Sequence, residues 1–556
     1  MPPGSNHRPM PSNDSGLGVD TQDRHSRDYS QERDREPNEQ TRLLSPERYE
    51  DRPPQWLSPD DPAVTPYNLW SVRILRLMTM VIAAITVIWF CVLLISMFAT
   101  PPGMHTPGSV FYSLFYTIVS MITLTSLLLF FDAPAQSSRI LSLIVAVVLV
   151  LDTVLVLAVE KTRIEEGWVG VASVLWALLI SLWVILVDVT VKWGKAEEEE
   201  RLTGRAETRR SAAEWIQVIL SNVTLTCILV AYVLVSMNLI LRAFDAALAP
   251  PGQQVWVDGG KYRMHVYCAD VSTPDADSAP FSADTLPHPD SKHKPGKHEE
   301  PTLLLIGGEV SVEDGLWQVA QHAVHNGSIE RYCMVDRPGY AWSDAAPSPL
   351  SASMSVAAIT EALSLTGEHG PWVVAGAGTG SFYARIFAQQ QGPEAVTGLL
   401  LIDPVHEQML PELGGAARGF GRFLHGLITP LGLVRIPGAV LRGRSRADRV
   451  WGRTARQSAK TAFARLQENL VAGSLTQREV LATRTLLREW NVPLGLVSSG
   501  VQSKKDPQWD TFQRDLATLT KNLAGWETVK DAPHKIWQTE KGRWAVEGMM
   551  RKLVKG

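Results

Sequence analysis

Five apolar stretches in the first half of the sequence constrain its fold more than any other feature. Each has the length of roughly 20 mainly apolar residues that a helix needs to cross the hydrocarbon core of a bilayer. They cover residues 74–98, 110–131, 140–159, 168–191 and 215–241. One such stretch is compatible with a buried helix of a soluble protein, but five in succession are not. The sequence therefore predicts a five-helix transmembrane domain over residues 66–245.

Lysine and arginine are distributed unevenly over the segments that connect these stretches. Arg73 and Arg76 flank the first stretch, the first connection has neither residue type, and the fourth connection has six of them between Lys192 and Arg210. Because basic connections remain cytosolic, we expect a cytosolic N-terminus. Five spans then place the C-terminal half on the lumenal or extracytosolic side. The glycosylation acceptor Asn326-Gly327-Ser328 lies in that half and agrees with this orientation.

The first 65 residues are rich in Pro, Ser, Asp, Glu and Arg and have almost no apolar run, so we expect a disordered cytosolic tail. Within it, Glu39 precedes the pair Leu43-Leu44 by four residues, which resembles an acidic-dileucine sorting signal. Such a signal indicates an endosomal or vacuolar membrane, although an idle leucine pair in a linker is an equally good interpretation. The acidic residues of the tail argue against a mitochondrial presequence.

Two carboxylates, Asp152 and Asp188, fall inside the predicted spans. Acids within a bilayer are costly and are functional candidates by default. Their positions in antiparallel helices put them at different depths, which disfavours a paired proton relay. We expect Asp152 to form hydrogen bonds between helices and Asp188 to extend toward the headgroups.

From residue 250 onward, short apolar runs alternate with turns and helical stretches, which predicts a soluble α/β domain over 250–556. We expect a hairpin over 255–268, a disordered insertion over 270–300, and further strands, which are 301–306, 332–335, 372–375, 398–402 and 494–498. Cys268 and Cys333 fall in this domain; two free thiols are favoured over a disulfide, since four cysteines form no disulfide framework.

Four motifs in order resemble the α/β-hydrolase superfamily. They are the turn after a strand at Asp336–Asp344, the strand–glycine turn–helix at 372–390, the strand Leu399–Asp403, and a histidine near the C-terminus, His534. The chain resembles fungal polytopic membrane proteins that carry a hydrolase-like domain. The resemblance covers about residues 255–554 and implies a sheet flanked by helices, with a helical cap over about 405–491. The basic segment Arg442–Arg465 of this cap is expected to be a solvated surface near anionic headgroups.

The resemblance fails at the nucleophile. Active members carry Gly-x-Ser-x-Gly at this turn, whereas the chain reads Gly376-Ala377-Gly378-Thr379-Gly380 and so has glycine in the serine position. The resemblance implies His534 as the histidine and leaves the acid open between Asp403 and Asp506. It also implies an oxyanion hole at Gly307, Gly308 and the backbone N–H of Thr379, next to the unusual acid Glu309.

The leading hypothesis is a membrane-anchored, catalytically degenerate hydrolase-like protein that binds a lipid, a small ligand or a protein. An active hydrolase of ester-like or lipid-like substrates, with His534 and an acid activating water, is the second hypothesis. A transporter or sensor that uses Asp152 is the third. No motif indicates a cofactor or a metal ion, and a net charge of -4 does not suggest a nucleic-acid partner.

Overall fold

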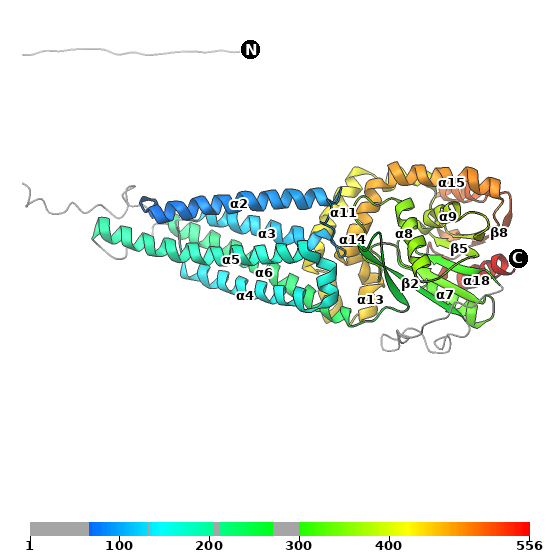
Figure 1. Ribbon diagram of the computed structural model, residues 1–556, viewed down its shortest axis with the longest axis horizontal. Helices are drawn as coiled ribbons and strands as arrows, with labels where there is room; N and C mark the ends of the chain where they lie inside the picture. The colour runs from blue at the N-terminus through cyan, green and yellow to red at the C-terminus, as the bar shows by residue number, and fades with distance from the viewer. Residues whose placement is uncertain (1–65, 132, 205–211, 271–299) are drawn as a thin grey trace, which may run out of the picture.

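The computed structural model describes residues 66–131, 133–204, 212–270 and 300–556. Two parts lie end to end: a bundle of long helices and a sheet flanked by helices (Figure 1). The sorting-like motif Glu39–Leu44, the predicted disordered tail and most of the predicted insertion lie outside the described residues.

Five helices of the bundle are long and apolar enough to cross a membrane. They are α2 (Trp70–Ser96), α3 (Val110–Leu129), α4 (Gln136–Ala158), α5 (Glu160–Thr203) and α6 (Ala212–Ala246). This confirms the predicted multi-pass membrane protein. From the sequence we expected residues 160–166 to connect the third and fourth spans without forming part of a helix, and this was wrong. These residues are helical and continue into α5 across a kink at Gly167, whose φ is 59°. Glycine adopts this left-handed conformation without steric cost.

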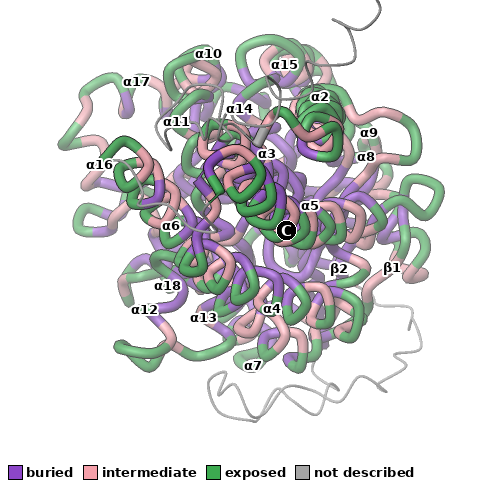
Figure 2. The backbone as a smooth tube through the Cα atoms, turned by 90° about the vertical axis from the view of Figure 1, so that its left-hand side faces the viewer, coloured by how far each residue is buried: buried purple, intermediate pink, exposed green. Residues whose placement is uncertain are grey.

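Tryptophans mark the two ends of the apolar surface of the bundle. Trp168 and Trp193, both on α5, are 55% and 60% exposed. Their separation of 25 positions corresponds to a rise of about 37 Å in a helix, which is close to the thickness of a hydrocarbon core plus part of the interfaces. Tryptophan prefers these interfaces. Seen along the bundle, buried residues gather inside and exposed residues lie at the periphery (Figure 2).

Both membrane acids have polar partners. Asp152 accepts hydrogen bonds from the hydroxyl groups of Tyr116 on α3, at 2.8 Å, and Ser236 on α6, at 2.5 Å, so it joins three helices as expected. The side chain of Asp188 is 12% exposed and forms an ion pair of 3.0 Å with Arg139 on α4, a partner that the sequence analysis did not identify. Its extension toward the headgroups stays a prediction.

The C-terminal part is built around one eight-stranded sheet of order β1-β2-β4-β3-β5-β6-β7-β8. The strands are β1 (Gln253–Val257), β2 (Tyr262–Asp270), β3 (Thr302–Ile306), β4 (Arg331–Val335), β5 (Trp372–Ala377), β6 (Val396–Ile402), β7 (Leu494–Ser499) and β8 (Leu523–Val529). Strand β2 runs antiparallel to both neighbours, and all other pairs from β4 to β8 are parallel. β3 and β5 are buried throughout, as sheets covered on both faces require.

Helices cover both faces of the sheet and enclose two apolar cores. One core includes α8 (Ala352–Leu365), α9 (Gly380–Gln391), α15 (Gln477–Trp490) and α17 (Pro507–Leu516), and the other includes α7 (Leu316–His325) and α18 (Glu540–Lys555). The short helix α16 (Gly500–Lys505) follows β7. This is the predicted α/β class.

The predicted cap is helical and lies between the sheet and the membrane bundle (Figure 1). It contains α10 (Leu410–Leu413), α11 (Ala416–Ile428), α12 (Arg435–Val440), α13 (Arg446–Val450) and α14 (Ala459–Val471). Helices α11 and α14 contact α3, while α12 and α13 contact α6. The apolar cluster at this junction joins Phe111 of α3 to Phe463 of α14. The expected solvated surface at 442–465 is thus partly wrong, since this segment includes junction residues.

Cys268 and Cys333 form a disulfide. The antiparallel register of β2 and β4 places these residues directly opposite each other. The favoured interpretation of two free thiols was wrong, because pairing depends on a strand register that residue spacing does not reveal.

Candidate functional site

The strand–turn–helix at the centre of the sheet has a sharply bent backbone. Strand β5 ends at Ala377, Gly378 adopts φ 54°, and α9 begins at Gly380. A Cβ atom at Gly376 would lie 2.6 Å from the carbonyl oxygen of Gly380, and one at Gly380 would lie 2.7 Å from that of Ile306. The outer two glycines are therefore required by close backbone contact, and the central residue is held at the apex of the turn.

This geometry is that of a nucleophile elbow. It follows the central strand of a sheet whose second strand alone is antiparallel. The C-terminal domain has the α/β-hydrolase fold. Its Gly378 stands where active members carry the nucleophile, so the elbow keeps its shape but has no hydroxyl or thiol at the apex.

A histidine–acid pair is retained beside the elbow. The Nδ1 atom of His534, on the loop after β8, lies 2.6 Å from Oδ2 of Asp403, which follows β6. The other carboxylate oxygen of Asp403 accepts hydrogen bonds from the backbone N–H of Ser499 at 2.9 Å and from Trp509 at 3.0 Å. Asp403 is completely buried and has a positive φ of 42°, so three contacts and a strained backbone fix one orientation.

The alternative acid, Asp506, lies elsewhere. It caps the N-terminus of α17 by accepting the backbone N–H of Gln508 at 2.9 Å. Between the two predicted positions, the structure thus pairs His534 with Asp403.

The carboxylate of Glu309 fills the space that a nucleophile would need. A Cβ atom at Gly378 would lie 2.9 Å from Oε1 of Glu309 and closer still to Oε2. Oε1 also accepts the backbone N–H of Thr379 at 3.0 Å. In active members this N–H stabilises the oxyanion of the tetrahedral intermediate. A fixed negative charge therefore occupies the oxyanion hole.

His534 lies between two carboxylates. Its Nε2 atom is 3.5 Å from Oε2 of Glu309, on the side opposite Asp403. Burial lowers the pKa of His534, but the hydrogen bonds and charges of Asp403 and Glu309 outweigh burial and raise it to about 10. Burial likewise raises the pKa of Glu309, but His534 and nearby backbone N–H groups lower it to about 2. At neutral pH the site holds the imidazolium of His534 and the carboxylate of Glu309.

Arg337 connects the oxyanion loop to the cap. Its Nε atom donates to the carbonyl oxygen of Gly307 at 2.9 Å, and its Nη2 atom donates to that of Gly308. Its Nη1 atom forms an ion pair with Glu468 on α14. Sequence reasoning missed both residues, although Arg337 lies inside the quoted turn motif, because the partner comes from a helix more than 100 residues away.

Two cavities meet at Glu309. One, of about 160 Å³, lies beneath the cap and is lined by apolar side chains such as Phe382, Leu410 and Leu413. The other, of about 530 Å³, opens beside His534 and is lined by four further cations, which are Arg453, Arg456, Arg465 and Lys535. Its acids are Glu309 and Asp314. An apolar chamber thus adjoins a basic mouth.

One buried group in the described residues has the donor types of a metal site, namely His265, Glu313 and Asp336. Nδ1 of His265 lies 2.8 Å from Asp336 and 3.9 Å from Glu313. Burial raises the pKa of Asp336 to about 7 and that of Glu313 well above its usual range. Both carboxylate oxygens of Glu313 are buried and have no hydrogen-bond partner among the described residues.

The predicted glycosylation acceptor, Asn326, lies at the exposed C-terminal end of α7. Its amide contacts His322 at 3.0 Å and Glu547 at 3.4 Å.

Comparisons with known proteins agree with this architecture. Residues 39–268 match the model of a region of unknown function (DUF2417). An uncharacterised protein of Schizosaccharomyces pombe is 28% identical over 527 residues, covering 89% of this chain and 93% of the relative. An uncharacterised vacuolar membrane protein of Saccharomyces cerevisiae is 21% identical over 400 residues, covering 63% and 59% respectively.

Solved structures similar to the chain include two esterases. The esterase of Thermogutta terrifontis is 16% identical, with 54% of this chain and 99% of that chain covered and a TM-score of 0.35. The esterase of Exiguobacterium antarcticum is 12% identical, with coverages of 53% and 96% and a TM-score of 0.34. The fold assignment rests on the strand order and the elbow.

Proposed function

We propose that this protein is a membrane-anchored, catalytically inactive hydrolase-like protein that binds an anionic amphiphile between its sheet and its cap. The observation that carries the proposal is the carboxylate of Glu309, which lies over Gly378 and accepts the N–H of Thr379. Two requirements of acyl transfer are missing together: a nucleophile at the elbow and a free site for a developing oxyanion.

The charge state of His534 argues against the alternative in which it activates water. A general base must be unprotonated at the working pH, whereas the carboxylates on both sides hold the pKa of His534 at about 10. The pair of His534 and Asp403 is then a structural remnant that fixes Glu309.

The two cavities support an amphiphilic ligand. The chamber lined by Phe382, Leu410 and Leu413 suits an acyl chain. The cations at the mouth suit a carboxylate or phosphate group, and Arg465 lines both cavities. Glu309 repels an anion that enters too deeply, so the charged group would remain at the mouth.

We further propose that the N-terminus is cytosolic, that the hydrolase-fold domain is lumenal, and that the membrane is vacuolar or endosomal. The basic residues of the connections support this orientation. The disulfide of Cys268 and Cys333 supports an oxidising compartment. The location of the Saccharomyces cerevisiae relative supports the vacuolar membrane.

Labelling of the full-length protein with a fluorophosphonate probe tests the loss of catalysis. We expect no labelling of the wild type or of either single variant. In Gly378→Ser the carboxylate of Glu309 blocks the new hydroxyl, and Glu309→Gly lacks a nucleophile. The double variant Gly378→Ser/Glu309→Gly should be labelled, and adding His534→Ala should abolish the labelling. A folded double variant that is not labelled would contradict the proposed elbow. Hydrolysis of p-nitrophenyl butyrate by the wild type that is lost in Glu309→Gln would show that Glu309 is a catalytic group.

Titration with oleate tests ligand binding. We expect oleate to raise the unfolding temperature of the wild type and of Arg514→Gln, whose arginine is exposed on α17, but to have less effect on Arg465→Gln. Equal effects on all three proteins would exclude the proposed mouth as the anion site.

A further inference from the structure

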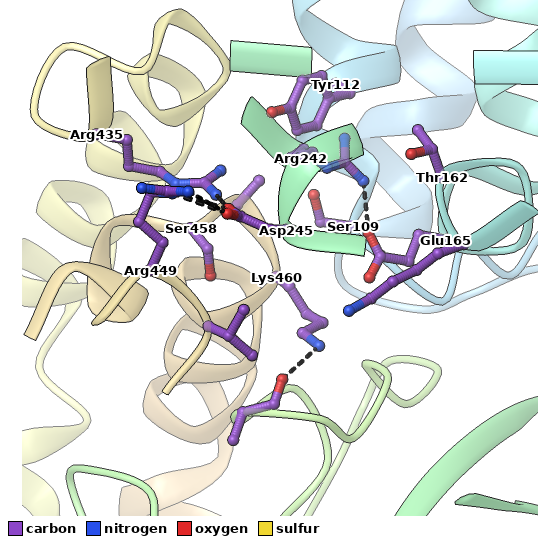
Figure 3. Close-up of a pocket in the computed structure, with 15 residues that line it drawn as sticks. Ser109, Tyr112, Thr162, Glu165, Arg242, Asp245, Arg435, Arg449, Ser458 and Lys460 are labelled. Carbon is purple, nitrogen blue, oxygen red and sulfur yellow. Dashed lines mark hydrogen bonds and ion pairs between the residues drawn. The ribbon is translucent and has the colours of Figure 1, made fainter. Parts of the chain in front are cut away.

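A separate polar cavity lies where the ends of the membrane helices meet the cap (Figure 3). Its volume is about 70 Å³, and its lining comes from α3, α5, α6, α12, α13 and the start of α14. A single water molecule needs a cavity volume of roughly 10–15 Å³, so this cavity accommodates a group of several heavy atoms. It contains no residue of the hydrolase-type site described above.

Positive charge exceeds negative charge around this cavity. Five basic side chains line it, which are Lys161, Arg242, Arg435, Arg449 and Lys460. The acids of the lining are Glu165 and Asp245. Arg242 forms ion pairs with Glu165 at 2.7 Å and with Glu166, behind the lining, at 2.6 Å. Counting Glu166, five cations face three carboxylates.

Two lysines of the lining, Lys161 and Lys460, form no ion pair among the described residues. Asp245 binds Arg435 and Arg449 on one side, while Glu165 binds Arg242 on the other (Figure 3). Lys460 lies between these groups, and its Nζ atom donates one hydrogen bond, of 2.9 Å, to the carbonyl oxygen of Ala341. Positive charge removed from water is costly unless an anion neutralises it.

Three donors of the lining lack a hydrogen-bond acceptor among the described residues. The hydroxyl of Ser109 is 1% exposed and has no partner, and neither does Nε of Arg435. Lys161 makes a cation–π contact of 5.4 Å with Trp342 but no hydrogen bond or ion pair within the described part of the chain. Ammonium and guanidinium groups only donate. The missing group must therefore be an acceptor.

The position of the cavity relates it to the bilayer. Lys161 and Glu165 precede the exposed, interfacial Trp168 by seven and three residues. The cavity thus lies at the level of the headgroups. Helix α3 begins at Val110, directly after Ser109, so the positive end of its dipole also faces this region.

We propose that this cavity binds a phosphate group, carried by a phospholipid of the adjacent leaflet or present as free phosphate. The ammonium groups of Lys161 and Lys460, Nε of Arg435 and the hydroxyl of Ser109 donate to its oxygens. The bound anion neutralises the excess charge and ties the membrane helices to the cap. This site is independent of the proposed amphiphile pocket.

The test compares full-length variants in nanodiscs of phosphatidylcholine, with and without phosphatidic acid. Lys161→Gln and Lys161→Gln/Lys460→Gln remove the unpaired cations. Arg163→Gln is the matched control, because it removes an exposed charge from the same helix. The affinity for phosphatidic acid is measured by native mass spectrometry. A lysine near an anionic lipid contributes about fivefold in affinity, so the double variant should bind roughly 25-fold more weakly and the control should be unchanged.

Inorganic phosphate distinguishes the two sources. If it does not compete with phosphatidic acid, the ligand is a lipid headgroup; if it competes and raises the unfolding temperature of the wild type alone, the ligand is free phosphate. In dodecyl maltoside, a detergent without phosphate, the lysine variants should unfold at or above the temperature of the wild type, because an unneutralised charge has been removed. Unchanged binding of phosphatidic acid in the double variant, without any effect of phosphate, would overturn the proposal.

Discussion

The carboxylate of Asp245 holds the membrane helices to the cap, and its removal has a predictable cost. Asp245, on α6, is bound by Arg435 at 2.8 Å and by Arg449 at 2.6 Å. All three side chains are 6–7% exposed. Breaking a buried ion pair leaves an uncompensated charge and costs about 3–5 kcal/mol. We expect Asp245→Asn to cost an amount within this range. The cost should not exceed it, because each arginine keeps one acceptor: Asn238 for Arg435, and the carbonyl oxygen of Arg444 for Arg449.

Asp510→Asn is the matched control. Asp510 pairs with Arg514 at the same 2.8 Å, but these side chains are 38% and 69% exposed. Exposed pairs contribute about 0–1 kcal/mol. Thermal unfolding of the full-length protein, followed by tryptophan fluorescence at a fixed scan rate, should show a decrease of roughly 5–8 °C for Asp245→Asn and about 2 °C or less for Asp510→Asn. Equal decreases would refute the argument, since the two substitutions differ chiefly in burial.

Three further predictions concern other groups. His534 has a pKa raised to about 10, so its stabilising contribution is complete below its ordinary pKa of 6.5 and is lost as the pH rises toward 10; His534→Asn should flatten this part of the profile of unfolding temperature against pH. Reduction of the disulfide between Cys268 and Cys333, separated by 65 residues, should cost about 4 kcal/mol, measured by denaturant unfolding with and without reductant. Asp152→Leu should destabilise the bundle by about 1–3 kcal/mol for each of two unpaired hydroxyl donors, whereas Asp152→Asn keeps an acceptor and should cost less, as compared by unfolding in detergent.

Features that depend on local pattern were predicted well from the sequence. The apolar stretches became α2–α6, since span length is a property of consecutive residues. The strands from β1 to β7 agree with the expected runs to within about four residues at each end. Strand β8 was not predicted, because Leu523–Val529 is polar and exposed at several positions as an edge strand.

Features that depend on contacts across the chain were not predicted. The sequence places Glu309 beside the oxyanion loop but does not reveal that its carboxylate reaches Thr379, which is 70 residues away. Likewise, Asp245 meets arginines 190 and 204 residues later, and nothing in a run of basic residues distinguishes an arginine at the junction from one in solvent. Burial of a charge is decided by the packing of whole elements.

The cap connects the two parts of the molecule, because α11 and α14 contact α3 while α14 also forms the roof over Glu309. A ligand that shifts the cap on entering the chamber also alters the contacts of the cap with α3 and α6. Binding and the arrangement of the membrane helices are then thermodynamically linked, and the linkage is reciprocal. A change in bilayer thickness that alters the tilt of these helices also changes the affinity of the proposed pocket. An occupied pocket resists that change in tilt by the same free energy.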